Sequence, residues 1–314
     1  MSRVLVTGGA GFIGSHLAER LVELGHQVTI YDNLCHGFLE NIESIKDKVI
    51  FIKEDLENFL SLEEAVKNKE YIFHLAANTS INLSLKKPYW SFQQNVDITV
   101  KLLELANKHN VKRFIFSSSA GVYGDNDNLP LAELETMNPS SPYGVEKAVC
   151  EYYVKLFSDI YKVDTVSLRY FNVFGPRQNA DLPHPGGVTI IVRQILENGR
   201  SELMGDGKQT RDMIYVDNIV EANILAMQKE EALKGIVYNV CTGKSIYIDK
   251  MHDQVSELMG KEKERSFIPF PDGNIMESKG DNSVIKKDLG FKIKVSLEDG
   301  LRKTVKWGIK KYSE

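Results

Sequence analysis

The sequence predicts an α/β fold in which a doubly wound parallel sheet is followed by a smaller C-terminal α/β region. Two patterns predict this fold. A short aliphatic strand runs through a glycine-rich loop straight into a helix at residues 3–21, and further strand patterns alternate with helical patterns up to about residue 175. A Pro/Gly-rich break at 175–187 then precedes a different pattern, so the smaller region is expected beyond it.

Each expected element follows from the residues that form it. Runs of β-branched, aliphatic and aromatic residues predict buried strands at 4–6, 27–31, 49–55, 71–77, 113–119 and 164–173. Apolar residues at helical spacing predict helices at 12–21, 95–109, 142–161 and 188–198. Ser61 and Glu64 form a capping box, which predicts the start of a further helix. Strands that alternate with helices in this way form a parallel sheet.

Composition and charge argue against several classes of protein. The 314 residues carry a net charge of −4 from mixed acids and bases with no basic stripe, so no nucleic-acid partner is expected. No apolar run approaches the roughly 18 residues of a membrane span, and no signal pattern is present, so a cytoplasmic protein without a membrane partner is expected.

The cysteines and histidines show no spacing typical of a disulfide framework or a metal site. Cys35, Cys150 and Cys241 are scattered, so most of them are expected to be small packing residues, and no bound metal is expected. His74 lies inside the apolar run 71–77. It is interpreted as a buried histidine with satisfied ring nitrogens rather than as a catalyst.

The glycine-rich loop predicts a dinucleotide site. Gly8, Gly9 and Gly11 let the backbone approach a pyrophosphate at the open amides of the following helix, and Gly14 lets that helix pack closely on the strand. Asp32 ends the second strand about 20 residues further on, where a carboxylate accepts ribose hydroxyls and repels a 2′-phosphate. The pattern favours NAD over NADP. In the alternative interpretation, the glycines only make a tight turn and Asp32 merely ends a strand.

A second group of residues has the composition of a proton-transfer site. Ser119 ends the strand 113–119, and Tyr143 and Lys147 are four residues apart on one face of the helix 142–161. The ammonium of Lys147 is expected to stabilise a Tyr143 phenolate and to lower the pKa of the phenol, while Ser119 would hold a substrate hydroxyl. Taken alone, this segment could equally be a helix start with a buried tyrosine and an exposed lysine.

Over nearly its full length the chain resembles the extended short-chain dehydrogenase/reductases, and within them the NAD-dependent sugar-nucleotide epimerase/dehydratase family. The motifs that carry the resemblance occur in the family's order. They are TGGAGFIG (7–14), YDNL (31–34), EDL (54–56), HLAA (74–77), FSSSAGVYG (116–124), YGVEK (143–147), RYFNVFGPRQ (169–178) and QTRDMIYVDNIVEA (209–222).

The resemblance implies a role for particular residues. It implies a catalytic set of Ser119, Tyr143 and Lys147. It implies contacts to NAD from Gly8, Gly11, Phe12, Ile13, Gly14, Asp32, Asn33, Asp55, Leu56, Ala76, Ala77, Tyr143 and Lys147. It implies contacts to a nucleotide-sugar substrate from Ser119, Asn172, Arg211 and Ser278.

The resemblance also implies a division of the chain and an assembly. Residues 1–175 would form a Rossmann-like NAD-binding domain, to which 212–235 return, and residues 176–314 would mainly bind the substrate. In similar proteins two long helices, here 95–109 and 142–161, pair across a homodimer. Tyr152, Leu156 and Leu103 could build that interface or could equally face their own sheet.

The residues after Ser119 discriminate between the reactions of the family. Dehydratases generally carry Asp-Glu there, whereas Ala120 and Gly121 offer no acid to protonate a departing hydroxyl. The sequence therefore favours a nucleotide-sugar 4-epimerase, which oxidises C4 transiently to a 4-keto sugar and returns the hydride. The alternatives are a 4,6-dehydratase or decarboxylase and, in another class, a non-catalytic NAD-binding regulator.

Two C-terminal positions bear on the substrate. Phe270 or Pro271 stands where similar epimerases carry an arginine that clamps the diphosphate, so Arg211, or else Arg177 or Arg193, is expected to bind it. Ser278 aligns with a position where a bulky residue excludes N-acetylated sugars. A serine there favours a roomier pocket, so both UDP-glucose and UDP-N-acetylglucosamine are candidate substrates.

Overall fold

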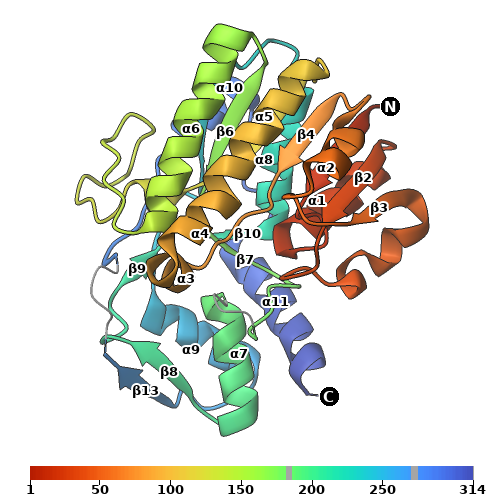
Figure 1. Ribbon diagram of the computed structural model, residues 1–314. Coiled ribbons are helices and arrows are strands. Elements are labelled where there is room, and N and C mark those ends of the chain that lie inside the picture. The colour runs from red at the N-terminus through yellow and green to blue at the C-terminus, as the bar shows by residue number, and fades with distance from the viewer. Residues whose placement is uncertain (182–185, 270–274, 314) are drawn as a thin grey trace.

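The computed structural model describes residues 1–181, 186–269 and 275–313. Its centre is a seven-stranded sheet in the order β11-β6-β5-β4-β1-β2-β3, in which all neighbouring strands are parallel (Figure 1). The strands are β1 (Arg3–Thr7), β2 (Gln27–Asp32), β3 (Val49–Lys53), β4 (Tyr71–His74), β5 (Arg113–Ser119), β6 (Thr165–Tyr170) and β11 (Ile236–Val240). The expected Rossmann-like α/β fold is confirmed.

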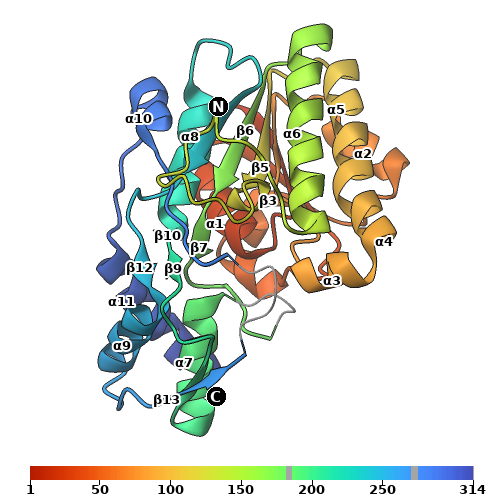
Figure 2. The ribbon, with the colours of Figure 1, turned by 90° about the vertical axis from the view of Figure 1, so that its left-hand side faces the viewer.

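Helices cover both faces of this sheet (Figure 2). One layer contains α1 (Phe12–Glu23), α8 (Val216–Gln228) and α10 (Ser283–Leu289), and the other contains α2 (Phe59–Val66), α5 (Ile98–Lys108) and α6 (Pro142–Tyr161). Successive residues of β1 point to opposite layers, since Val4 and Val6 pack in the first core and Leu5 packs in the second.

A smaller region lies in the lower part of Figure 1 and has its own core, built around Val192, Val255 and Leu301. Its helices are α7 (Gly187–Asn198), α9 (Ile248–Leu258) and α11 (Leu297–Tyr312). Its short strands pair as β8 (Ser201–Met204) with β13 (Arg265–Ile268), and β9 (Thr210–Arg211) with β12 (Ile246–Tyr247). Between the two regions, β7 (Asn172–Phe174) pairs with β10 (Met213–Tyr215), after which α8 and β11 return to the main layers.

Two expected elements are divided in the structure. The strand expected at 164–173 leaves the central sheet at Phe171, which is buried against Tyr123 and Cys241, and only then continues as β7. The helix expected at 95–109 begins earlier, as α4 (Pro88–Phe92), and passes through a π-helical turn, η2 (Gln93–Asp97), into α5. Shorter helical segments are η1 (Leu39–Lys48), α3 (Ile81–Lys86) and η3 (Ala120–Val122).

The expected capping box is wrong. Helix α2 begins before Ser61, at Phe59, and its N-cap is Asn58, whose Oδ1 accepts a hydrogen bond from Ser61 N at 3.3 Å. The interpretation of His74 is confirmed. Its ring nitrogens lie 2.8 Å from Thr7 Oγ1 and 3.1 Å from Thr99 Oγ1, and burial lowers its pKa to about 3, so the ring is neutral.

The three cysteines have free thiols, with Cys35 exposed and Cys150 and Cys241 buried. Within the described part of the chain, no cluster of three or more His, Cys, Asp or Glu side chains could hold a metal ion. None of the helices in those same ranges has the length and apolar character needed to cross a membrane.

A buried ion pair joins α6 to the sheet. Arg169 on β6 donates to Glu151 on α6 through Nη2 at 2.7 Å and through Nε at 2.9 Å, and both side chains are 4% exposed. The same guanidinium donates to the Tyr123 hydroxyl at 2.7 Å, and Ser118 Oγ donates to Glu151 at 2.5 Å. Because every charged group here is hydrogen-bonded, the network fixes β5, β6 and α6 relative to one another.

Arg169→Leu is expected to destabilise the protein by about 3–5 kcal/mol, because it leaves the Glu151 carboxylate buried without its cation. The free energy of unfolding from urea denaturation measures this. Arg302→Leu, which removes an exposed arginine paired with Glu298, is the control and should cost about 0–1 kcal/mol. Equal effects of the two substitutions would contradict a structural role for the buried pair.

Candidate active site

A cavity of about 780 Å³ lies at the carboxyl ends of β1, β2, β4 and β5. Strands β1 and β4 are neighbours in the sheet, and the chain proceeds from them toward opposite edges, which is where parallel α/β proteins bind ligands. The predicted residues that line the cavity are Gly8, Gly11, Phe12, Ile13, Gly14, Asp32, Asn33, Asp55, Leu56, Ala76, Ala77, Ser119, Tyr143 and Lys147. The predicted residues Asn172, Arg211 and Ser278 are not among those that line it.

The glycine loop brings three backbone segments into close contact. A Cβ on Gly14 would lie 2.1 Å from Gly8 O, and a Cβ on Gly8, whose φ is +69°, would lie 2.8 Å from Ala76 N. Side chains are therefore excluded at both positions. Gly11 is the N-cap of α1 and no side chain caps this helix, so its first amides remain available to an anion in the cavity.

Asp32 presents a fixed carboxylate to the cavity. Its Oδ2 accepts from Ala10 N at 2.9 Å and its Oδ1 accepts from Leu34 N at 2.8 Å. Burial raises the pKa of Asp32, and these two hydrogen bonds oppose the rise. Among the described residues that line the cavity, Lys147 is the only lysine or arginine, so no guanidinium or ammonium stands beside Asp32 to bind a 2′-phosphate.

The predicted catalytic residues meet at another part of the same cavity. Ser141 caps α6 by accepting from Gly144 N at 3.2 Å, which places Tyr143 in the first turn. Ser119, at the end of β5, lines the cavity together with Tyr143, and its Oγ accepts from Gly121 N at 3.1 Å. Lys147 Nζ donates to Ser117 O at 2.7 Å and lies 5.9 Å from the centre of the Tyr143 ring.

The electrostatics of this group differ from the expectation. Burial raises the pKa of Tyr143 to about 12, although the hydrogen bond with Ser119 lowers it. Burial also lowers the pKa of Lys147 to about 8. The expected lowering of the Tyr143 pKa by Lys147 is therefore not seen, because burial of the phenol raises this pKa and the ammonium of Lys147 is directed at the Ser117 carbonyl.

Of the arginines considered for a diphosphate, Arg211 alone has no carboxylate within ion-pair distance in the described part of the chain. Its Nη1 donates to Thr210 O at 2.8 Å, and burial lowers its pKa, although the charge of Asp125 opposes this. By contrast, Arg177 pairs with Glu19 at 2.8 Å and Arg193 pairs with Asp181. Phe270 and Pro271 lie outside the described residues.

A buried aspartate holds the predicted substrate residues near one another. Asp212, which follows Arg211, accepts from Thr242 N at 2.8 Å, Gly243 N at 2.9 Å and Gly280 N at 3.3 Å. Its carbonyl oxygen accepts from Asn172 N at 3.1 Å. Asn172 and Arg211 are thereby tied to the segment that contains Ser278, which is 6% exposed.

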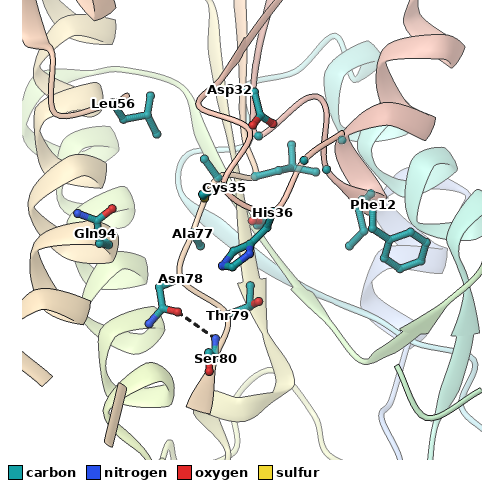
Figure 3. A pocket seen from close by; sticks show the side chains of 18 of the residues that line it. Phe12, Asp32, Cys35, His36, Leu56, Ala77, Asn78, Thr79, Ser80 and Gln94 are labelled. Atoms are coloured by element: carbon teal, nitrogen blue, oxygen red, sulfur yellow. Dashed lines mark hydrogen bonds between the residues drawn. The ribbon is translucent and has the colours of Figure 1, made fainter. Parts of the chain in front are cut away.

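Sequence reasoning missed a wall of the cavity. It consists of Asn78, Thr79 and Ser80, which follow β4, together with Gln94 from η2 (Figure 3). Asn78 Oδ1 accepts from Ser80 N at 3.2 Å, and Leu56 and Gln94 lie on the opposite side of the cavity from Phe12 (Figure 3). Further lining residues that were not predicted include Tyr31, Cys35, His36, Glu54, Glu57, Leu83, Trp90, Tyr170, Phe171, Gln178 and Asn179. The position of Asn78 directly after a strand was a usable signal, whereas Gln94 lies within a helix and carries none.

Comparison with known proteins agrees with this geometry. The model of the NAD dependent epimerase/dehydratase family matches residues 4–241. The chain is similar to a UDP-N-acetylglucosamine 4-epimerase structure from Methanobrevibacter ruminantium, in complex with UDP-N-acetylmuramic acid, with 40% identity, a TM-score of 0.94 and 99% of each chain covered. It is 37% identical to UDP-glucose 4-epimerase of Mycolicibacterium smegmatis, over 97% of this chain and 98% of the relative.

Relatives with a different reaction also match. UDP-N-acetyl-alpha-D-glucosaminuronate decarboxylase of Bacillus cytotoxicus is 33% identical, over 97% of both chains. The family expected from the motifs is confirmed by the family model and by relatives that match along nearly the whole chain. The protein thus belongs to the NAD-dependent epimerase/dehydratase family, with NAD as its cofactor.

Proposed function

We propose that the protein is a nucleotide-sugar 4-epimerase that interconverts UDP-glucose and UDP-galactose or their N-acetylated counterparts. The observation that carries this proposal is that Ser119, Tyr143 and Lys147 line the same cavity as the glycine loop, with Lys147 Nζ held by Ser117 O at 2.7 Å. NAD, when bound, supplies reversible acceptance of the hydride from C4 of the sugar. Gly8, Gly11 and Gly14 would cradle its pyrophosphate, and Asp32 its adenosine ribose.

The residues of the chain would move the proton. Tyr143 would take the proton of the sugar 4-hydroxyl as C4 is oxidised and would return it after the 4-keto sugar has turned its other face. Ser119 would orient that hydroxyl, because its side chain lines the cavity together with Tyr143. Lys147 would support the phenolate from the same helix face, with its ammonium held by Ser117 O at 2.7 Å.

The distribution of carboxylates favours epimerisation over dehydration. Among the described residues that line the cavity, the acids are Asp32, Glu54, Asp55 and Glu57, which end or follow β2 and β3. The strand end that carries Ser119 continues into η3 with Ala120 and Gly121. Elimination of water or loss of a carboxylate needs further proton transfer beside the sugar, and the lining residues near Tyr143 offer no acid for it.

The substrate would extend from the cavity toward the smaller region. Arg211 is available for the diphosphate because its guanidinium, half-buried, has no carboxylate partner in the described part of the chain. Asn172 is tied to the same strand end and would contact the nucleotide sugar. A small side chain at Ser278 would leave space for an N-acetyl group.

A homodimer is also proposed. Tyr152, Leu156 and Ile160 form a stripe along α6 and are 66%, 42% and 62% exposed. Tyr89 on the neighbouring helix α4 is 74% exposed. An apolar stripe of this kind is typical of a helix that packs against another subunit. Leu103 does not contribute, because it is fully buried against its own sheet.

Tyr143→Phe should reduce turnover by at least about a hundredfold while leaving NAD bound, because it removes only the proton-transfer group. Anomeric proton NMR of UDP-glucose and UDP-N-acetylglucosamine, with mass spectrometry, measures conversion at constant mass. Tyr152→Phe on the same helix is the matched control and should keep full activity. Full activity in the Tyr143 variant would refute the assignment, and a change in product mass would indicate a dehydratase or decarboxylase.

Ser278→Tyr should lower turnover of the N-acetylated sugar relative to UDP-glucose by at least about tenfold, because the larger side chain fills the space for the N-acetyl group. The ratio of kcat/KM for the two sugars measures this. Ser278→Ala keeps the position small and should leave the ratio unchanged. An unaltered ratio in a folded Ser278→Tyr protein would contradict the proposed role.

Leu156→Asp should convert the dimer to a monomer, because a charge in an apolar helix interface is costly to bury. Light scattering on a sizing column should give twice the 35.5 kDa chain mass for the unaltered protein and the single mass for the variant. Ile50→Asp, at a residue 63% exposed on β3, is the control and should stay dimeric. A monomeric unaltered protein would refute the dimer.

A further inference from the structure

Glu146 is a buried acid between the two catalytic residues of α6. It is 4% exposed, and no lysine, arginine or histidine of the described residues forms an ion pair with it. The other buried acid of the helix, Glu151, is bound by Arg169 at 2.7 Å. An unpaired buried carboxyl group is costly to a fold, so its contacts indicate what it does.

Its contacts lead to the wall of the cavity. Glu146 Oε2 accepts from Ser91 Oγ on α4 at 2.8 Å and from Asn95 Nδ2 in η2 at 2.5 Å. Both partners also bind Asn78, since Ser91 Oγ accepts from Asn78 Nδ2 at 2.9 Å and Asn95 Oδ1 accepts from Asn78 N at 2.8 Å. Asn78 begins the wall formed with Thr79 and Ser80, so the carboxyl group links α6 to that wall.

The π-helical turn supports this link. Asn95 lies in η2, and its carbonyl oxygen accepts from Thr99 Oγ1 at 2.5 Å and from Cys150 Sγ on α6 at 3.5 Å. Turns of this kind are rare and are found mostly at functional sites. The irregular turn thus places both the side chain and the carbonyl of Asn95 against α6.

The charge of Glu146 also acts on its neighbours. A negative charge here raises the pKa of Tyr143 and of Lys147, because it disfavours a phenolate and favours an ammonium. Burial raises the pKa of Glu146 itself, while the bonds from Asn95 and Ser91 and the charge of Lys147 lower it.

Few other charges compete with that of Glu146. On α6 the remaining titratable groups that act on Tyr143 or Lys147 are Cys150 and Glu151. From the packed elements, Ser91 and Asn95 are uncharged, and His74 on β4 is neutral because its pKa is about 3. The charge of Glu146 is therefore expected to affect the proton-transfer group directly.

We propose that Glu146 is a positioning residue: its carboxyl group holds the Asn78 wall against the catalytic helix, and its charge sets the pH range in which Tyr143 and Lys147 transfer protons. The proposal rests on the proposed epimerase function for its kinetic test. The two parts of the role are separable, because Glu146→Gln keeps an oxygen that can accept both hydrogen bonds and removes the charge. Glu146→Asp keeps the charge and shortens the reach.

The pH profile of kcat tests the charge. In Glu146→Gln the acidic and the basic limb of the profile should both move to lower pH by about one unit, because the lost negative charge had raised the pKa of Tyr143 and of Lys147. A shift of this order is expected for a charge within about 10 Å at an effective dielectric constant of about 20. Glu146→Asp should keep the limbs in place, as should Glu104→Gln, which removes an exposed charge from α5. Profiles of Glu146→Gln and the unaltered protein that coincide would overturn the electrostatic part.

NADH affinity, measured by fluorescence, tests the link to the wall without any turnover. Glu146→Asp and Ser91→Ala should each weaken NADH binding by about tenfold. Each breaks a hydrogen bond between Glu146 and the residues that hold Asn78, so the wall that lines the proposed NAD cavity would no longer be fixed. Unchanged NADH affinity in both variants would overturn the positioning part of the proposal. If the Glu146 variants fail to fold, Ser91→Ala alone tests that part. Absence of epimerisation by the unaltered protein would instead refute the proposed function, while the NADH measurement would still test the link.

Discussion

The contact between the β1–α1 loop and the loop after β4 is the constraint on which the site depends. A Cβ on Gly8 would lie 2.8 Å from Ala76 N, and a Cβ on Gly14 would lie 2.1 Å from Gly8 O. Only bare backbone can pack this closely. The contact fixes the start of α1 against the sheet, and it also fixes the beginning of the segment that continues through Asn78 to Ser80 along the cavity.

The helix α6 extends this constraint to the residues proposed to transfer protons. Its inner face buries Glu146, Lys147 and Glu151 and carries the half-buried Tyr143, which is an unusual concentration of polar groups for a helix that also packs in the core. Glu151 is neutralised by Arg169, Lys147 donates to Ser117 O, and Glu146 accepts from Asn95 and Ser91. Each of these bonds joins α6 to a different element, so the position of Tyr143 is determined from several sides at once.

The smaller region is attached by a second buried acid. Asp212 is fully buried and accepts hydrogen bonds from the backbone amides of Thr242, Gly243 and Gly280, which come from two separate segments. Arg211 precedes it and keeps its guanidinium free of carboxylates in the described part of the chain. The guanidinium of Arg211 is the cation that this end of the site would offer to an anionic nucleotide, while the Asp212 carboxylate is occupied by hydrogen bonds from the backbone.

The sequence by itself determined the fold class, the family and the residues with a local signature, because strand periodicity, the glycine spacing at Gly8, Gly11 and Gly14, and the four-residue spacing of Tyr143 and Lys147 are local properties of the chain. It misplaced the cap of α2, since Asn58 and Ser61 are both suitable capping residues and only the packed helix selects one. The tertiary structure decided what depends on distant segments. It brought Asn78, Asn95 and Glu146 together from three parts of the chain. It divided the expected strand at Phe171, which packs against Cys241. It also raised rather than lowered the pKa of Tyr143, because burial is a property of the whole fold and not of residues that are close in the sequence.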